Sequence, residues 1–134
     1  MAYDPKDGVV VAHMGGYSNA KPATYHYVIA KNAWSRVPDS PEMPNGYDGG
    51  TVFGCAPAAG VCLLVDGTAK DGAVWAYNVK EQKWTKLAPQ GPPPPKDGKA
   101  MGYFDPARNV LVVHTRGNPP WVYRFKKTEP QPGK

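Results

Sequence analysis

The chain has 134 residues, a net charge of +5, and 16 prolines and 15 glycines that together exceed a fifth of its length. This length suits one domain, and the absence of any run of about 18 apolar residues excludes a predicted transmembrane helix. Residues 96–134 hold eight basic and three acidic residues and carry the whole charge excess. No aromatic platform accompanies these basic residues, so we interpret them as a solvated face and expect neither nucleic acid nor a membrane as a partner.

A segment near the N-terminus recurs twice along the chain. Tyr3–Gly16 (YDPKDGVVVAHMGG) returns as Phe104–Gly117 (FDPARNVLVVHTRG), and Cys55–Thr68 (CAPAAGVCLLVDGT) lies between them. The shared proline is spaced by 52 and then by 49 residues (Pro5, Pro57, Pro106). A period near 50 residues is typical of stacked supersecondary units such as propeller blades.

Each copy of this segment predicts a β-hairpin. A short apolar strand, for example Thr51–Cys55 or Met101–Phe104, precedes the proline-containing turn. An apolar run follows the turn in every copy (Val9–Ala12, Val61–Val65, Val110–Val113). These runs do not alternate with polar residues, so we expect the second strand to be covered on both faces.

A second segment repeats in step with the first. Ala23–Val37 lies over Ala73–Leu87 at a shift of 50 residues without a gap, which aligns two aromatic pairs (Tyr27 with Tyr77, Trp34 with Trp84). The alternation predicts a half-exposed strand with aromatic residues on one side, and it places His26 on the surface. The third copy is shortened to Pro120–Phe125 (PWVYRF). We therefore predict an all-β chain with two four-stranded units and one three-stranded unit.

The boundaries of the units follow from proline-rich joints. We place the units at about 1–44, 45–95 and 96–126, followed by a polar tail at 127–134. The joints, Pro38–Gly50 and Pro89–Gly98, are interpreted as stiff loops between units in preference to ligands of proline-binding domains.

Both cysteines, Cys55 and Cys62, belong to the second copy. Their counterparts in the other copies are apolar or aromatic and face each other across a tight connection. Two buried thiols would fit this position, and so would a cross-strand disulfide. We predict no metal site and no cofactor, because two cysteines without a nearby histidine provide too few ligands.

These features resemble a kelch-type β-propeller, as in kelch-repeat proteins and the central domain of galactose oxidase. The resemblance is carried by the apolar run ending in Gly15 and Gly16, and by the spaced aromatic residues of VWAYNVKEQKWTKL and its counterpart. It covers residues 1 to about 125 and implies about three blades. Two copies depart from the double glycine of the pattern, with Asp66-Gly67 and Arg116-Gly117 in its place.

The resemblance also implies an open ring. Propellers close with at least four blades, so three blades leave one sheet face open at each end, and open apolar faces of that size are not tolerated in a soluble monomer. We expect either self-association or a longer propeller of which this chain is a piece. A homodimer with six blades is favoured, because the chain opens at a first strand and ends in a polar tail, and because two-fold dimers are the commonest closed assemblies.

Five residues are candidates for ligand binding. His13 and His114 occupy the same place in their copies, where the resemblance implies the ligand-binding face of a propeller; the others are Tyr17, Arg116 and Trp121. The second copy has Val65 at the histidine position, which weakens any regular ligand set.

The sequence therefore supports a non-catalytic propeller scaffold that self-assembles and binds a protein or glycan on its ring face. The alternative is a carbohydrate-active enzyme whose site forms across the assembled ring. No Ser-His-Asp order, phosphate loop or paired-carboxylate motif stands out, and no motif reproduces the copper site of galactose oxidase. The first residues show no signal peptide, and the compartment stays open between the cytoplasm and export after processing.

Overall fold

The computed structural model describes residues 1–16, 20–46, 50–67, 72–94 and 99–125. This part of the chain forms three antiparallel sheets and one short 3-10 helix, η1 (Ile29–Lys31). The first sheet contains β1 (Ala2–Asp4), β2 (Val9–Met14), β3 (Ala23–Val28) and β4 (Ala33–Arg36); the middle sheet contains β5 (Thr51–Ala56), β6 (Val61–Asp66), β7 (Ala73–Asn78) and β8 (Lys83–Leu87); the third sheet contains β9 (Met101–Asp105), β10 (Val110–His114) and β11 (Trp121–Tyr123). The predicted all-β chain with two four-stranded units and one three-stranded unit is confirmed. The predicted polar tail lies outside the described residues.

Each sheet is a meander in which consecutive strands pair. The first hairpin of every sheet turns in the same way, because a proline fixes one backbone angle and a later residue takes a left-handed conformation. That residue is Gly8 (φ 63°), Gly60 (φ 68°) or Asn109 (φ 54°). The repeated sequence thus encodes a repeated turn.

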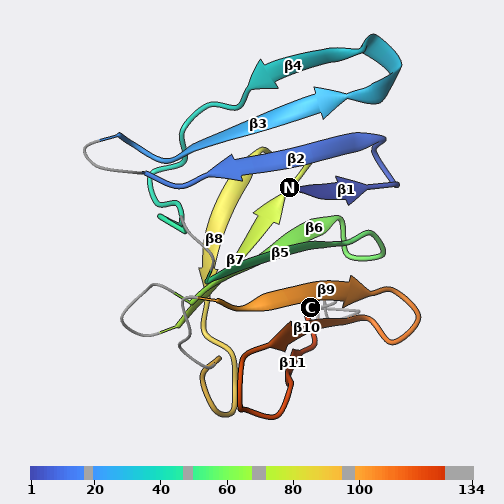
Figure 1. The fold of residues 1–134 in the computed structure, drawn as a ribbon. Coiled ribbons are helices and arrows are strands. Elements are labelled where there is room, and N and C mark those ends of the chain that lie inside the picture. The colour runs from blue at the N-terminus through green and yellow to red at the C-terminus, as the bar shows by residue number, and fades with distance from the viewer. Residues whose placement is uncertain (17–19, 47–49, 68–71, 95–98, 126–134) are drawn as a thin grey trace, which may run out of the picture.

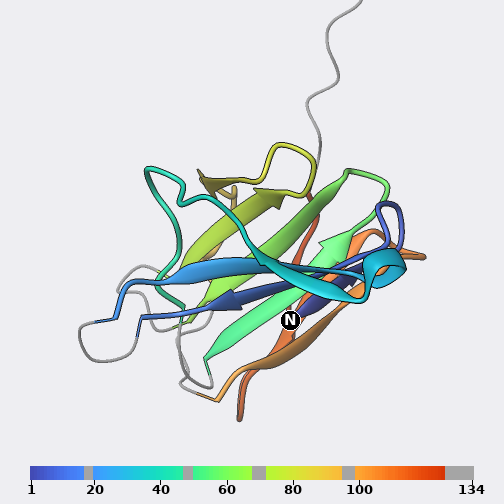
Figure 2. The same cartoon turned by 90° about the horizontal axis from the view of Figure 1, so that it is seen from above.

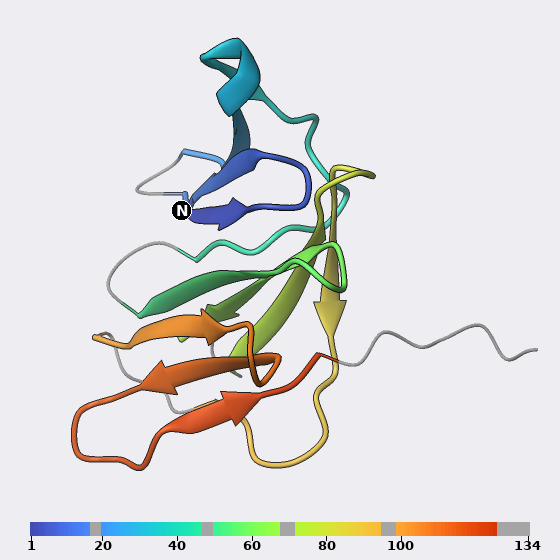
Figure 3. The same ribbon diagram turned by 90° about the vertical axis from the view of Figure 1, so that its right-hand side faces the viewer.

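The three sheets stack in chain order as layers (Figures 1 and 3). The sheets approach one another most closely at their first strands, with β1 and β9 both packed against β5. Gly54 permits this approach, since a Cβ atom there would lie 2.9 Å from the Cβ of Phe104. In the view from above, the strands of the first sheet cross those of the middle sheet obliquely (Figure 2). Sheets that meet along their first strands give a propeller-like arrangement.

The hydrophobic core has two parts, one on each face of the middle sheet. The cluster toward the first sheet includes Val9, Val11, Cys55, Cys62, Leu64, Trp75, Tyr77 and Trp84. The cluster toward the third sheet includes Val52, Leu63, Val65, Val74, Ala76, Leu111 and Val113. All six residues of β6 are buried, as expected for a strand covered on both faces.

Two expectations from the alternating segment are wrong. The strand β7 is not half exposed, because Ala73–Tyr77 are all buried between the neighbouring sheets. His26 is not a surface residue, because its side chain points from β3 toward the middle sheet and is buried there. In β3 the buried side carries Thr24 and His26, while Tyr25 and Tyr27 occupy the more exposed side.

Candidate functional site

The outer face of the first sheet, turned away from the middle sheet, is rich in aromatic side chains. Tyr3, Val10, Tyr27 and Trp34 are cross-strand partners in one row from β1 to β4. Trp34 is 53% exposed, and its ring lies 5.2 Å from that of Tyr27, centroid to centroid. Isolated exposed apolar residues are ordinary on a protein surface, but a row of three aromatic residues and a valine across four strands indicates an interaction site.

A cavity of about 540 Å³ opens beside this row. It is lined by Met1, Ala12, His13, Met14, Tyr25 and Trp34. We call the outer side of the first sheet, including this cavity, the receiving face.

The outer face of the third sheet is also apolar. Met101 is 74% exposed and Tyr103 is 54% exposed, and Val122 is similarly open. The imidazole of His114 stacks on the ring of Tyr103, with 6.1 Å between centroids. We call this side of the third sheet, made by Met101, Tyr103, Val112, His114 and Val122, the inserting face.

The two outer faces repeat the two halves of the internal packing. In the receiving face, Trp34 and Tyr27 stand where the middle sheet has Trp84 and Tyr77, both of which are buried against the first sheet. In the inserting face, His114 stands where the first sheet has His13. The contacts between the first and middle sheets therefore show what these residue types do once they are covered.

His13 connects the first and middle sheets through hydrogen bonds and a ring contact. Its Nε2 donates a hydrogen bond to the carbonyl oxygen of Pro44 (2.8 Å), which fixes Nδ1 as the acceptor of a bond from the Thr24 hydroxyl (3.0 Å). The Thr24 oxygen accepts in turn from the indole N–H of Trp84 (2.9 Å). The rings of His13 and Trp84 meet edge to face, with 4.8 Å between centroids.

Burial lowers the pKa of His13, against opposing effects from the Pro44 hydrogen bond and the charge of Asp66. The neutral imidazole suits the hydrogen bonds of this network, in which one nitrogen donates and the other accepts. His13 is thus committed to joining two sheets.

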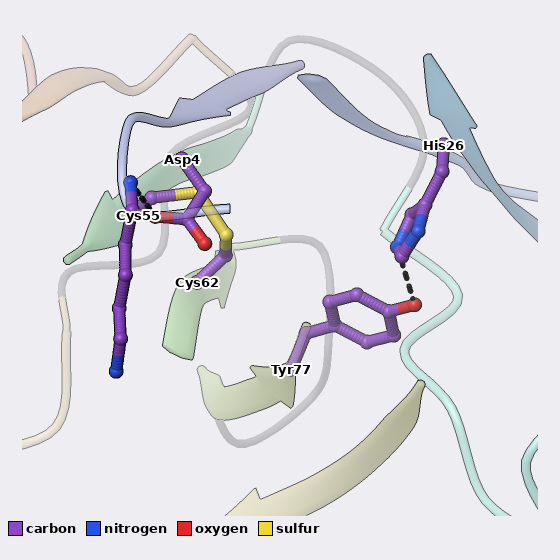
Figure 4. The surroundings of a disulfide bond; sticks show 6 residues. Asp4, His26, Cys55, Cys62 and Tyr77 are labelled. Carbon is purple, nitrogen blue, oxygen red and sulfur yellow. Dashed lines mark hydrogen bonds between the residues drawn. A yellow bond between two sulfur atoms is a disulfide. The ribbon is translucent and has the colours of Figure 1, made fainter. Parts of the chain in front are cut away.

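A second polar pair, His26 and Tyr77, lies between the first and middle sheets (Figure 4). The hydroxyl of Tyr77 and Nε2 of His26 are hydrogen-bonded at 2.8 Å. Burial raises the pKa of Tyr77 and lowers that of His26, so both groups favour their neutral forms.

The disulfide between Cys55 and Cys62 lies beside Asp4 in this layer. It joins directly opposed positions of β5 and β6, so both cysteines are paired in the structure. Asp4 accepts a hydrogen bond from the backbone N–H of Lys6 (3.1 Å), while its Oδ2 is buried with no partner among the described residues. Burial raises the pKa of this carboxyl more than the Lys6 hydrogen bond lowers it.

The five predicted ligand-binding residues do not form one described cluster. His13 joins the first and middle sheets, whereas His114 stacks on Tyr103 on the outer side of the third sheet. Trp121 begins β11, stacks on Tyr123 and donates its indole N–H to the carbonyl oxygen of Pro92 (3.0 Å). Arg116 is exposed in the turn after β10. Tyr17 lies outside the described residues.

Sequence reasoning missed Thr24 and the role of the proline-rich joints. Besides the Pro44 and Pro92 carbonyls, Ser40 accepts the backbone N–H of Trp84 (3.0 Å). The available signal was the repeat itself, because Thr24 aligns with Val74 of the second copy. A polar residue at an otherwise apolar repeat position indicates a specific partner.

The described residues provide neither a metal-binding cluster nor a membrane-spanning helix. Among residues 1–16, 20–46, 50–67, 72–94 and 99–125, no group of three or more His, Cys, Asp or Glu side chains could hold a metal ion. The same ranges contain no helix that is long and apolar enough to cross a membrane.

The fold is that of an all-β, propeller-like protein with two unequal open faces. No model of a protein family matches the chain, and no curated protein matches it. Among solved structures, the chain is similar to the crystal structure of TolB from Acinetobacter baumannii, with 14% identity and a TM-score of 0.49. The match covers 90% of this chain and 28% of that one.

Proposed function

We propose that the chain is a non-catalytic, kelch-like propeller scaffold that completes its ring by self-association. The inserting face of one copy covers the receiving face of another, and the reverse contact closes the ring with six blades. The ring face then presents a binding surface for a protein or a glycan.

One observation supports this proposal above all: the receiving face repeats residues that are buried when another sheet covers them. Trp34 is 53% exposed, whereas its counterpart Trp84 is 4% exposed. Of the large apolar side chains exposed in the described residues, all except Ile29 belong to the two outer sheets or their terminus (Met1, Tyr3, Met14, Trp34, Met101, Tyr103, Val122). Covering both faces removes this surface from water, which favours association.

The solution mass tests the proposal directly. Sedimentation equilibrium over a range of concentrations should give a species of twice the 14.5 kDa chain mass. A folded species that stays at 14.5 kDa at every concentration would refute self-association and favour further blades from a longer chain.

A further inference from the structure

The internal interface between the first and middle sheets provides a template for contact between copies. From the first sheet, Val9, Val11 and the ring of His13 face the middle sheet. The middle sheet receives them with Cys62, Leu64, Tyr77 and Trp84. The ring of His13 meets that of Trp84 edge to face, with 4.8 Å between centroids, at β8, the outer strand of the middle sheet.

The inserting face copies the first half of this template. Val112 and His114 of β10 stand where β2 has Val11 and His13, while Val110, the counterpart of Val9, is already buried within the chain. Val112 and His114 pair with Tyr103 and Met101 of β9, which places the four side chains on one side of the sheet. This side faces away from the core of the third sheet, where Leu111 and Val113 are buried.

The receiving face copies the second half. Val10 and Ala12 stand where the middle sheet has Cys62 and Leu64, and Tyr27 and Trp34 stand where it has Tyr77 and Trp84. The cavity of about 540 Å³ lies against Ala12 and Trp34. In the middle sheet the equivalent residues Leu64 and Trp84 are buried, and the ring of His13 contacts that of Trp84.

We infer that the partner on the receiving face is a second copy of this chain, held so that His114 enters the cavity beside Trp34. The inference rests on the proposed self-association and adds its register. The ring pair His114 and Trp34 then reproduces the internal pair His13 and Trp84. The contact is between unlike faces, so two copies form it twice around one two-fold axis.

The contact between two chains lacks one interaction of the internal template. Pro120 stands where the first sheet has Thr24, so no hydroxyl bridges the two rings between copies. The contact between copies therefore depends on apolar packing more than the internal one does.

A double-mutant cycle on the dissociation constant of the dimer tests this register. The variants are Trp34→Ala, His114→Ala and their combination, measured by sedimentation equilibrium. We expect Trp34→Ala to weaken dimerisation about 30-fold or more, as for a large aromatic side chain that becomes buried in an interface. We expect a coupling of about fivefold between the two substitutions, since the ring contact occurs twice in each dimer.

Ile29→Ala supplies the matched control. Ile29 is 50% exposed, which is similar to the 53% of Trp34, but it lies in η1 and not on a strand of the receiving face. It should leave the dissociation constant unchanged and should not couple to His114→Ala. Circular dichroism of each variant checks that the sheets are retained, and Trp34→Phe repeats the measurement with a smaller change.

The outcomes separate this inference from the proposed function. Coupling between positions 34 and 114 supports the register. A wild-type dimer in which the two substitutions act independently overturns the register and leaves self-association standing. A wild-type chain that is monomeric at every concentration overturns both.

Discussion

Replacing Thr24 with valine should loosen the joint between the first and middle sheets. Thr24 is 3% exposed, and its hydroxyl lies 2.9 Å from the indole nitrogen of Trp84 and 3.0 Å from Nδ1 of His13. Valine keeps the shape of the side chain but removes the hydroxyl. Two buried polar groups then lose a partner, and each such loss costs about 1–3 kcal/mol. We expect the free energy of unfolding to fall by about 2–6 kcal/mol.

Equilibrium unfolding in urea, followed by tryptophan fluorescence and by circular dichroism, measures this loss. Thr85→Val is the matched control, because Thr85 lies exposed on β8 next to Trp84. The control should change the free energy of unfolding by no more than about 0.5 kcal/mol. A loss below about 1 kcal/mol for Thr24→Val would refute the reasoning, because buried groups left without a partner cost at least that much.

Two further predictions concern pH and redox state. The pKa values of His13 and His26 are lowered by burial, so the unfolded chain binds more protons below about pH 6.5, and the free energy of unfolding should fall between about pH 7.5 and about pH 5.5. Urea midpoints across this range measure the slope; His26→Asn should reduce it, and a flat profile in the wild type would contradict the assignment. Reducing the bond between Cys55 and Cys62, which are seven residues apart, should lower the free energy of unfolding by about 2–3 kcal/mol, measured as the urea midpoint with and without a phosphine reductant. An unchanged midpoint after complete reduction would argue against this contribution.

The repeated sequence was sufficient to predict the number and order of the strands. Equivalent prolines marked equivalent turns, and the apolar runs after them became the second strand of each sheet. The shortened third copy correctly predicted three strands for the third sheet, as found up to residue 125, where the described chain ends. These features are local, so each copy of the repeat carries them independently of its neighbours.

The environment of each face could not be predicted in the same way. An alternation of small and aromatic residues, as in AVWAYN of β7, usually indicates one exposed side, but here Ala76 fills one core while Trp75 and Tyr77 fill the other. The inward direction of His26 was also missed. It depends on the Tyr77 hydroxyl, which lies 51 residues away and meets it only when the sheets stack.

The candidate site was predicted only in part. The histidine positions His13 and His114 are equivalent, as the repeat indicated, but their surroundings differ because only one of them is covered by another sheet. The sequence suggested open apolar ends, and the structure places Trp34 and Tyr103 there. Which residues meet across those ends depends on three-dimensional register, which a repeat alone does not supply.

The double burial of the middle sheet ranks the parts of the molecule by how readily they open. The middle sheet packs on both faces and each outer sheet on one, so we expect a single copy to open at an outer sheet before the middle sheet. Amide protons of β6 therefore exchange last with solvent, and those of β4 and β11 at the outer edges exchange early. In a single copy we therefore expect unfolding to reach the central repeat last, whereas in the closed ring proposed above every sheet has two neighbours.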